Sequence, residues 1–199
     1  MLVVETGQVA IRLTRPSPAA LADARDSARA DSLTYDPVGM SSFGAAPPGY
    51  KLDRWDRELG SADDTFAIAA RSLLAWDVHR GAGLVVCTDG PAQVGLVVAM
   101  AAPLPIGFVD VVCRVVDVRT EPDRVGFTYG TLPVHPEQGE ESFDVVRSDG
   151  RVRFEIVACS RPRHPLARLV PPVARALQRS ATVRYLDAMQ SSLSSDRSE

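Results

Sequence analysis

The sequence predicts an α+β domain in which an antiparallel sheet is followed by one long helix packed across it. Turn signals divide residues 84–160 into short runs rich in Val, Ile, Phe and Thr, and an amphipathic pattern follows Pro162. A chain of 199 residues, 45% hydrophobic and 24% charged, is long enough for one buried core. We therefore expect a single domain over residues 1–189 and a flexible polar tail over residues 190–199, which are rich in serine.

The N-terminal part of the chain predicts a strand, a helix and a long loop. Residues 2–13 are rich in Val and Ile and predict the strand. Ser17 suits the N-cap of a helix and Pro18 its first position, so we expect a helix over 17–30. Proline and glycine are too dense in residues 34–50 for regular structure, and a loop of this length is more often functional than idle.

A short strand and a second helix are expected next. The strand covers residues 50–59, and Asp63 or Asp64 then caps a helix with one apolar face. The helix ends at His79, because Gly81 follows it closely.

The second half of the chain predicts the main sheet and the last helix. The expected strands cover residues 84–88, 94–101, 108–118, 125–131, 140–147 and 151–160, and Asp149-Gly150 is the clearest hairpin turn. Beyond Pro162, apolar residues recur at steps of three and four, which predicts a long amphipathic helix. Pro171 and Pro172 either kink this helix or delay its start.

Composition argues against several classes of protein. A net charge of -3 and a pI near 5.7 do not fit a surface that is basic throughout, so no strong signal for nucleic acid is present. Cys87, Cys113 and Cys159 are odd in number and lie in apolar stretches, which favours buried thiols in a reducing compartment. We expect a cytoplasmic protein without a membrane span, because the N-terminus lacks signal-peptide features and the apolar run 94–105 is too short to cross a bilayer.

Five stretches of the chain together resemble one family. They are Leu33-Thr34-Tyr35-Asp36-Pro37-Val38-Gly39, Pro47-Pro48-Gly49-Tyr50, Phe66 through Trp76 to His79, Tyr129-Gly130-Thr131-Leu132-Pro133 with His135 through Phe143, and Phe154-Glu155-Ile156 continuing to Ser160-Arg161-Pro162. In this order they are similar to the domain-of-unknown-function family 1990, an uncharacterised family of bacteria and plants. The resemblance spans roughly residues 33–186, with departures at Met40 and Cys159. It implies a fold and a set of positions to examine, but no reaction.

The order of elements also resembles the helix-grip fold of START-like and birch-pollen-allergen-like proteins. That resemblance implies a curved antiparallel sheet of about six to seven strands wrapped around the C-terminal helix. It further implies an apolar cavity between sheet and helix. Fold alone does not fix function, so the ligand-binding role below is an analogy at the level of fold.

The densest set of reactive groups lies in residues 129–143, where His135 is the first candidate for a general base. Glu140 or Glu141 would orient its imidazole ring. His79 is the other candidate base. The competing interpretation, a solvated hairpin whose glutamates face water, is favoured on general grounds. No pattern predicts a metal site or a cofactor.

Five residues are candidate polar anchors for a ligand: Tyr35, Trp76, His79, Tyr129 and Arg161. Trp76 and His79 are three residues apart on one expected helix, so they share a face. Core packing is the stronger interpretation of that pair. Arg161 either binds a carboxylate or phosphate or ties the end of its strand to a glutamate.

Three functions follow as hypotheses. The first is binding of a small apolar or amphipathic ligand in the cavity. The second is an enzyme that uses acid/base residues of the same cavity. The third is an interaction protein whose last helix binds an anionic partner through Arg168, Arg175 and Arg179. The sequence leaves the ligand, the oligomeric state and a lid role for the 34–50 loop open.

Overall fold

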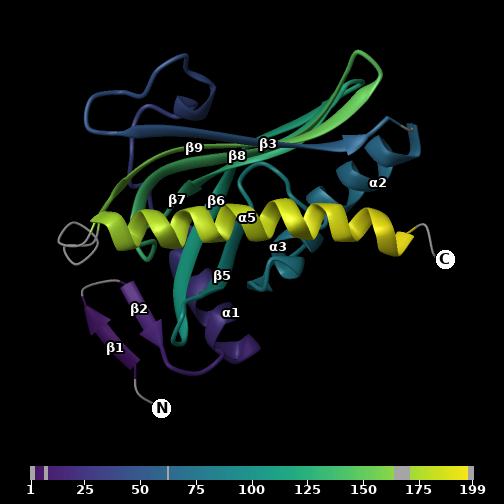
Figure 1. The fold of residues 1–199 in the computed structure, drawn as a ribbon. Helices are drawn as coiled ribbons and strands as arrows, with labels where there is room; N and C mark the ends of the chain where they lie inside the picture. Colours follow the sequence, from purple (N-terminus) through teal and green to yellow (C-terminus); the bar gives the residue numbers. More distant parts are fainter. Residues whose placement is uncertain (1–2, 7–8, 62, 164–170, 197–199) are drawn as a thin grey trace.

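A curved antiparallel sheet forms the centre of the computed structural model, and one long helix crosses its concave face (Figure 1). The structure describes residues 3–6, 9–61, 63–163 and 171–196. This arrangement confirms the predicted α+β class with a helix-grip architecture.

The described part of the chain contributes nine strands to the sheet. They are β1 (Val3–Thr6), β2 (Val9–Arg12), β3 (Lys51–Gly60), β4 (Val85–Cys87), β5 (Val97–Pro103), β6 (Phe108–Glu121), β7 (Arg124–Thr131), β8 (Glu137–Ser148) and β9 (Arg151–Pro162). The order is β1-β2-β6-β7-β8-β9-β3, and β5 pairs with the other edge of β6 and carries β4. The sheet has more strands than the six to seven that the resemblance implies, and one more than the eight located in the sequence, because the strand predicted over residues 2–13 is instead two paired strands.

The helices lie close to their predicted positions. They are α1 (Pro18–Ser27), α2 (Asp63–Leu74), α3 (Asp77–Gly81) and α5 (Pro171–Asp196), with 3-10 turns at Ala28–Ala30 and Met40–Ser42. Ser17 caps α1 as predicted, since its Oγ accepts a hydrogen bond from the backbone of Ala20 at 3.2 Å. The helix expected to run to His79 is divided at Trp76, whose φ of 67° lies in the left-handed region.

The two faces of the sheet carry different layers because strand residues alternate between them. On the concave face, side chains such as Phe127, Phe143 and Phe154 pack with α2, α3 and α5 into the main core. On the convex face, Leu21 of α1 packs against small residues of β5. The 34–50 loop packs on the same convex face, where Tyr35 and Met40 contact Cys159 of β9.

The tail expected from residue 190 is wrong for residues 190–196, because α5 continues to Asp196. Leu193 is only 3% exposed and belongs to the main core, one helical step of four residues after the buried Met189. The serines that suggested a tail also fit a helix, since Ser192 Oγ donates to the carbonyl of Met189 at 2.8 Å. Residues 197–199 lie outside the described part of the chain.

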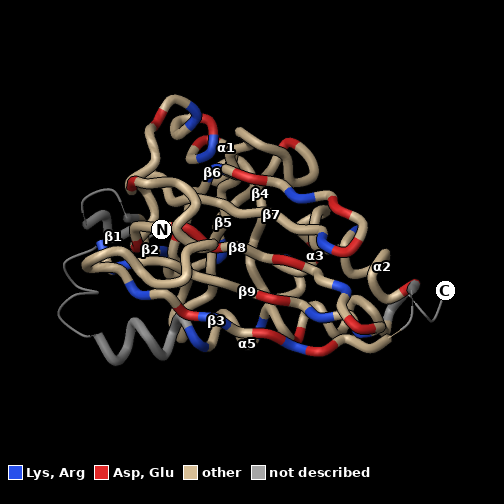
Figure 2. The backbone as a smooth tube through the Cα atoms, turned by 90° about the horizontal axis from the view of Figure 1, so that it is seen from above, with Lys and Arg blue, Asp and Glu red and all other residues tan. Residues whose placement is uncertain are grey.

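Charge is distributed without a basic face among the described residues. Figure 2 shows acidic and basic positions intermingled along β8, β9 and β3. Some of them pair across strands, as Arg151 does with Glu58 at 2.8 Å. Of the three free cysteines, Cys113 and Cys159 are buried, as predicted, and Cys87 is half-buried. No described helix is long and apolar enough to cross a membrane.

Candidate functional site

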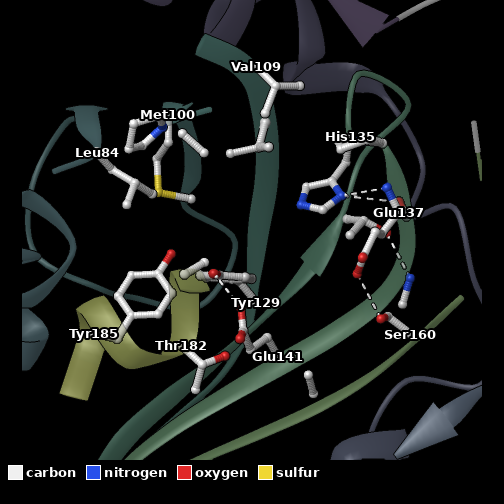
Figure 3. Close-up of a pocket in the computed structure, with 18 of the residues that line it drawn as sticks. Leu84, Met100, Val109, Tyr129, His135, Glu137, Glu141, Ser160, Thr182 and Tyr185 are labelled. Carbon is white, nitrogen blue, oxygen red and sulfur yellow. Dashed lines mark hydrogen bonds between the residues drawn. The ribbon is translucent and has the colours of Figure 1, made fainter. Parts of the chain in front are cut away.

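A cavity of about 330 Å³ lies between the concave face of the sheet and α5 (Figure 3). Its described walls come from β2, from Leu84 just before β4, from β5 to β9, from the turns that follow β5 and precede β8, and from one stretch of α5. The lining residues labelled in Figure 3 are Leu84, Met100, Val109, Tyr129, His135, Glu137, Glu141, Ser160, Thr182 and Tyr185. The cavity is therefore where the helix-grip resemblance predicts one.

The cavity has an apolar side and a polar side. Leu84 and Met100 lie on one side, and the side chains of His135, Glu137 and Ser160 lie on the other (Figure 3). Ligand sites commonly combine apolar walls with a few polar groups that fix orientation. The arrangement suits a molecule with one apolar end and one polar end.

Strand alternation brings the polar groups to this face. Glu137, Gly139 and Glu141 are alternate residues of β8, and all three line the cavity. Gly139 has a φ of 145°, and a Cβ added there would collide with the carbonyl oxygen of Cys159 on β9. Glycine thus allows β8 and β9 to approach closely between the two glutamates.

Tyr129 and Glu141 form a hydrogen-bonded pair on the cavity wall. They are direct partners in the β7–β8 register, and the Tyr129 hydroxyl donates to Glu141 Oε2 at 2.8 Å. Burial raises the pKa of Glu141 from 4.5 to about 7, although the hydrogen bond from Tyr129 acts in the opposite direction. A carboxyl group with this pKa exchanges protons near neutral pH, which is what acid/base chemistry requires.

His135 and Glu137 form a second polar group beside the first. His135 Nδ1 lies 3.0 Å from the backbone nitrogen of Glu137 and 3.1 Å from its carbonyl oxygen, so it accepts from the former in one tautomer and donates to the latter in the other. Burial lowers the pKa of His135 to about 4, and the ring is therefore neutral at pH 7. Ser160 donates to Glu137 Oε2 at 2.8 Å, and burial raises the pKa of Glu137.

Comparison with known proteins identifies the family. The family described as "Domain of unknown function (DUF1990)" matches residues 34–188. The chain belongs to the DUF1990 family. A UPF0548 protein of Deinococcus radiodurans is 30% identical over 186 residues, which covers 87% of this chain and 93% of that protein.

Solved structures resemble this DUF1990 protein in fold. A hypothetical protein from Helicobacter pylori superposes with a TM-score of 0.55 at 12% identity, covering 80% of this chain and 95% of that one. The structure of Ara h 8.0201 gives a TM-score of 0.48 at 11% identity, covering 72% of this chain and 99% of that one. At such low identity, the Helicobacter protein supports the fold and nothing further.

Of the five candidate ligand anchors in this DUF1990 protein, the structure places Tyr129 alone on the described cavity wall. Tyr35 lies on the convex face, where its hydroxyl donates to Glu140 Oε2 at 2.9 Å. Arg161 also points away from the cavity, with its guanidinium 4.6 Å from the Tyr50 ring centroid. Arg161 Nε donates to Gln138 Oε1 at 3.2 Å, so it ties the strand end to a glutamine and not to the glutamate expected from the sequence.

Trp76 and His79 lie in an aromatic cluster behind the cavity rather than on its wall. The His79 ring is 0% exposed and lies within about 6 Å of five aromatic rings: Trp76, Phe127, Tyr129, Phe143 and Tyr185. Neither ring nitrogen has a hydrogen-bond partner among the described residues. Burial lowers the pKa of His79 to about 3, so the ring is a neutral packing group without the carboxylate that a general base needs.

Glu140 borders the cavity, but its carboxylate is directed to the other side of the sheet and holds the 34–50 loop. Its Oε2 accepts from the Tyr35 hydroxyl and from the backbone of Gly39, each at 2.9 Å, and its Oε1 accepts from the backbone of Ser41. The expected orientation of His135 by Glu140 is therefore wrong, because the two side chains lie on opposite faces of the sheet. The loop also lies on the convex face, so it does not close over this cavity.

Four residues that line the cavity of this family member were not predicted as site residues. Leu84, Met100, Thr182 and Tyr185 lie in predicted strands or in the predicted last helix, and the sequence indicated no individual role for them. The alternation of side chains along each strand is the sequence signal that could have identified lining residues, because it places Glu141 and Glu140 on opposite faces of the sheet. The described residues contain no group of three or more His, Cys, Asp or Glu side chains that could hold a metal ion.

Most side chains of the three arginines predicted to bind an anionic partner, Arg168, Arg175 and Arg179, lie outside the described part of the structure. Arg168 falls in the undescribed segment 164–170, and the structure describes no side chain for Arg175. Arg179 is exposed on α5. Binding of an anionic partner through these arginines thus stays a prediction from sequence alone.

Proposed function

We propose that this DUF1990 protein binds a small amphipathic molecule in the cavity between the sheet and α5. The observation that carries the proposal is the cavity itself, whose volume of about 330 Å³ falls within the range of small-molecule sites. Leu84 and Met100 supply apolar wall, while Tyr129, Glu141 and His135 supply a few oriented polar groups. The three free thiols fit a reducing compartment, so the cytoplasm stays our predicted location.

The test fills the cavity and leaves its polar groups in place. Ala102 lines the cavity, so Ala102→Phe places a ring where the ligand would lie. Ala45→Phe is the matched control, because Ala45 is exposed in the loop on the convex face. Native mass spectrometry of each protein purified from its own host measures any small molecule carried along.

Wild-type protein and Ala45→Phe should carry the same molecule, and Ala102→Phe should lose it while keeping the circular dichroism spectrum of a folded protein. Retention of the molecule by folded Ala102→Phe would show that it binds elsewhere. If the wild-type protein carries no molecule and binds none of the three probes described below, the proposal is wrong.

A second candidate function is acid/base catalysis in the same cavity. The specific observation is that Glu141, with a pKa raised to about 7 by burial, and the neutral His135 face one space. Of the two partners expected for His135 from the sequence, Glu140 and Glu141, the geometry supports Glu141. Incubation of the released molecule with wild-type protein and with Glu141→Gln tests it. Conversion by the wild type alone supports catalysis, and an unchanged molecule in both samples excludes it for that compound.

A further inference from the structure

We propose that the ligand carries a cationic amine at its polar end and that Glu141 receives this amine, with Glu137 adding negative potential beside it. The inference rests on the proposed function, since it names the chemical class of ligand for the same cavity. It depends on which hydrogen bonds and ion pairs the enclosed carboxylates form.

Other enclosed acids of this protein have all the donors they need. Asp110 pairs with Arg12 at 2.6 Å. Asp144 accepts from two arginines, with Arg119 at 2.6 Å and Arg124 at 3.1 Å. An enclosed carboxylate is costly unless it is paired and hydrogen-bonded, so these contacts are what the physics of burial requires.

Glu137 and Glu141 lack such compensation. Each accepts one hydroxyl hydrogen bond, from Ser160 and Tyr129 respectively, and both bonds reach Oε2. Neither carboxyl group forms an ion pair with any residue that the structure describes. An ionised carboxylate accepts about four hydrogen bonds, so Oε1 of each group is available to a donor inside the cavity.

The groups around Glu141 supply no positive charge. Tyr129 faces it from the neighbouring β7, Cys113 lies on β6 beyond that strand, Tyr185 faces it from α5, and Glu137 lies four residues away on β8. None of the four side chains is a cation. The nearby Glu137 raises the cost of a second negative charge, which a cationic ligand would relieve.

The remaining basic groups on the described wall do not change this balance. His135 is neutral, because burial lowers its pKa to about 4. Arg184 also lines the cavity; its Nη1 donates to Ser180 Oγ at 3.2 Å on the exposed side of α5, and its Nε is buried without a hydrogen-bond partner among the described residues, so it forms no ion pair with Glu137 or Glu141. The cavity thus combines an apolar wall with unpaired acidic oxygens, which is complementary to an amphipathic amine.

Three probes with the same apolar chain separate charge from hydrophobic burial: n-octylamine, 1-octanol and octanoate. Their dissociation constants are measured by calorimetry at pH 8, where Glu141 is ionised and the amine is protonated. We expect n-octylamine to bind about tenfold or more tightly than 1-octanol, the factor expected of one charge-assisted hydrogen bond. Octanoate should bind most weakly, because it brings a third carboxylate to the same end.

Glu141→Gln should remove the advantage of n-octylamine over 1-octanol. Glu121→Gln is the matched control, since it removes the same charge from an exposed position at the end of β6 and should keep the order of the three probes. This control separates a local contact from the net charge of the protein.

The possible outcomes distinguish a failure of the amine inference from a failure of the proposed ligand binding. Equal affinity for the three probes, or tightest binding of octanoate, overturns the amine inference and leaves ligand binding intact. An amine preference that survives in Glu141→Gln also overturns it. Binding of none of the probes overturns the proposed function and this inference together.

Discussion

Adjacent residues of β8 serve opposite faces of the sheet. Glu140 fastens the 34–50 loop to the convex face through Tyr35, Gly39 and Ser41. Glu141 faces the cavity and meets Tyr129. Because side chains alternate along a strand, the odd- and even-numbered residues of β8 lie on opposite faces of the sheet, so that one set faces the cavity and the other contacts the 34–50 loop.

Replacing Glu140 tests its structural role. Glu140→Gln substitutes an amide for a carboxylate that accepts three hydrogen bonds, and its NH₂ group would face at least one donor. We expect a loss of about 1–3 kcal/mol in the free energy of unfolding, measured by urea denaturation. Probe binding in the cavity should not change, because the side chain lies on the other face.

Glu58→Gln provides the control for Glu140→Gln. Glu58 is exposed on β3 and pairs with Arg151 at the surface, so its replacement should cost less than about 1 kcal/mol. Equal losses for the two variants would show that the Glu140 contacts contribute little to stability.

At the scale of elements, α5 owes its last turns to one buried side chain. Leu193→Ala removes a core residue that is 3% exposed and should cost about 2–4 kcal/mol. Val183→Ala on the same helix should cost under about 0.5 kcal/mol, because Val183 is 47% exposed. Thermal unfolding followed by circular dichroism measures both, and similar losses would contradict a packed C-terminal end.

The predictable elements are those with a local chemical signal. Ser17 marks the start of α1 by a cap, and Asp149 and Gly150 mark the β8–β9 hairpin by their capacity for positive φ, observed at 52° and 71°. The break at Trp76 has no such signal, since a non-glycine residue there adopts φ 67° in a tightly packed core. The end of α5 was missed because Leu193 is a single apolar residue among serines.

The site was harder to predict than the fold because it depends on three-dimensional neighbours. The segment 129–143 did contain Tyr129, His135 and Glu141, which now line one cavity. Sequence order alone did not reveal that Glu140 and Arg161 point to the convex face. Alternation along β8 and β9 accounts for both misplacements once the strand register is known.

The whole molecule should show a pH dependence of stability with opposing contributions. Burial lowers the pKa of His79 to about 3 and of His135 to about 4. The unfolded chain therefore binds more protons than the folded protein below about pH 6.5, and these histidines reduce stability as the pH falls. Glu141 acts in the other direction, because its pKa is raised and the folded protein holds the extra proton.

The contribution of Glu141 can be isolated by one substitution. Its pKa rises from 4.5 to about 7, so its burial costs nothing extra below pH 4.5, costs progressively more between pH 4.5 and about 7, and stays constant above that. At about 1.4 kcal/mol for each pKa unit, the upper bound is about 3 kcal/mol. The stability of Glu141→Gln relative to the wild type should therefore increase between pH 5 and pH 8 in urea denaturation, whereas that of Glu121→Gln should stay constant. A constant difference for Glu141→Gln as well would mean that water already solvates this carboxylate in the empty cavity, and that an incoming amine has no unmet charge to neutralise.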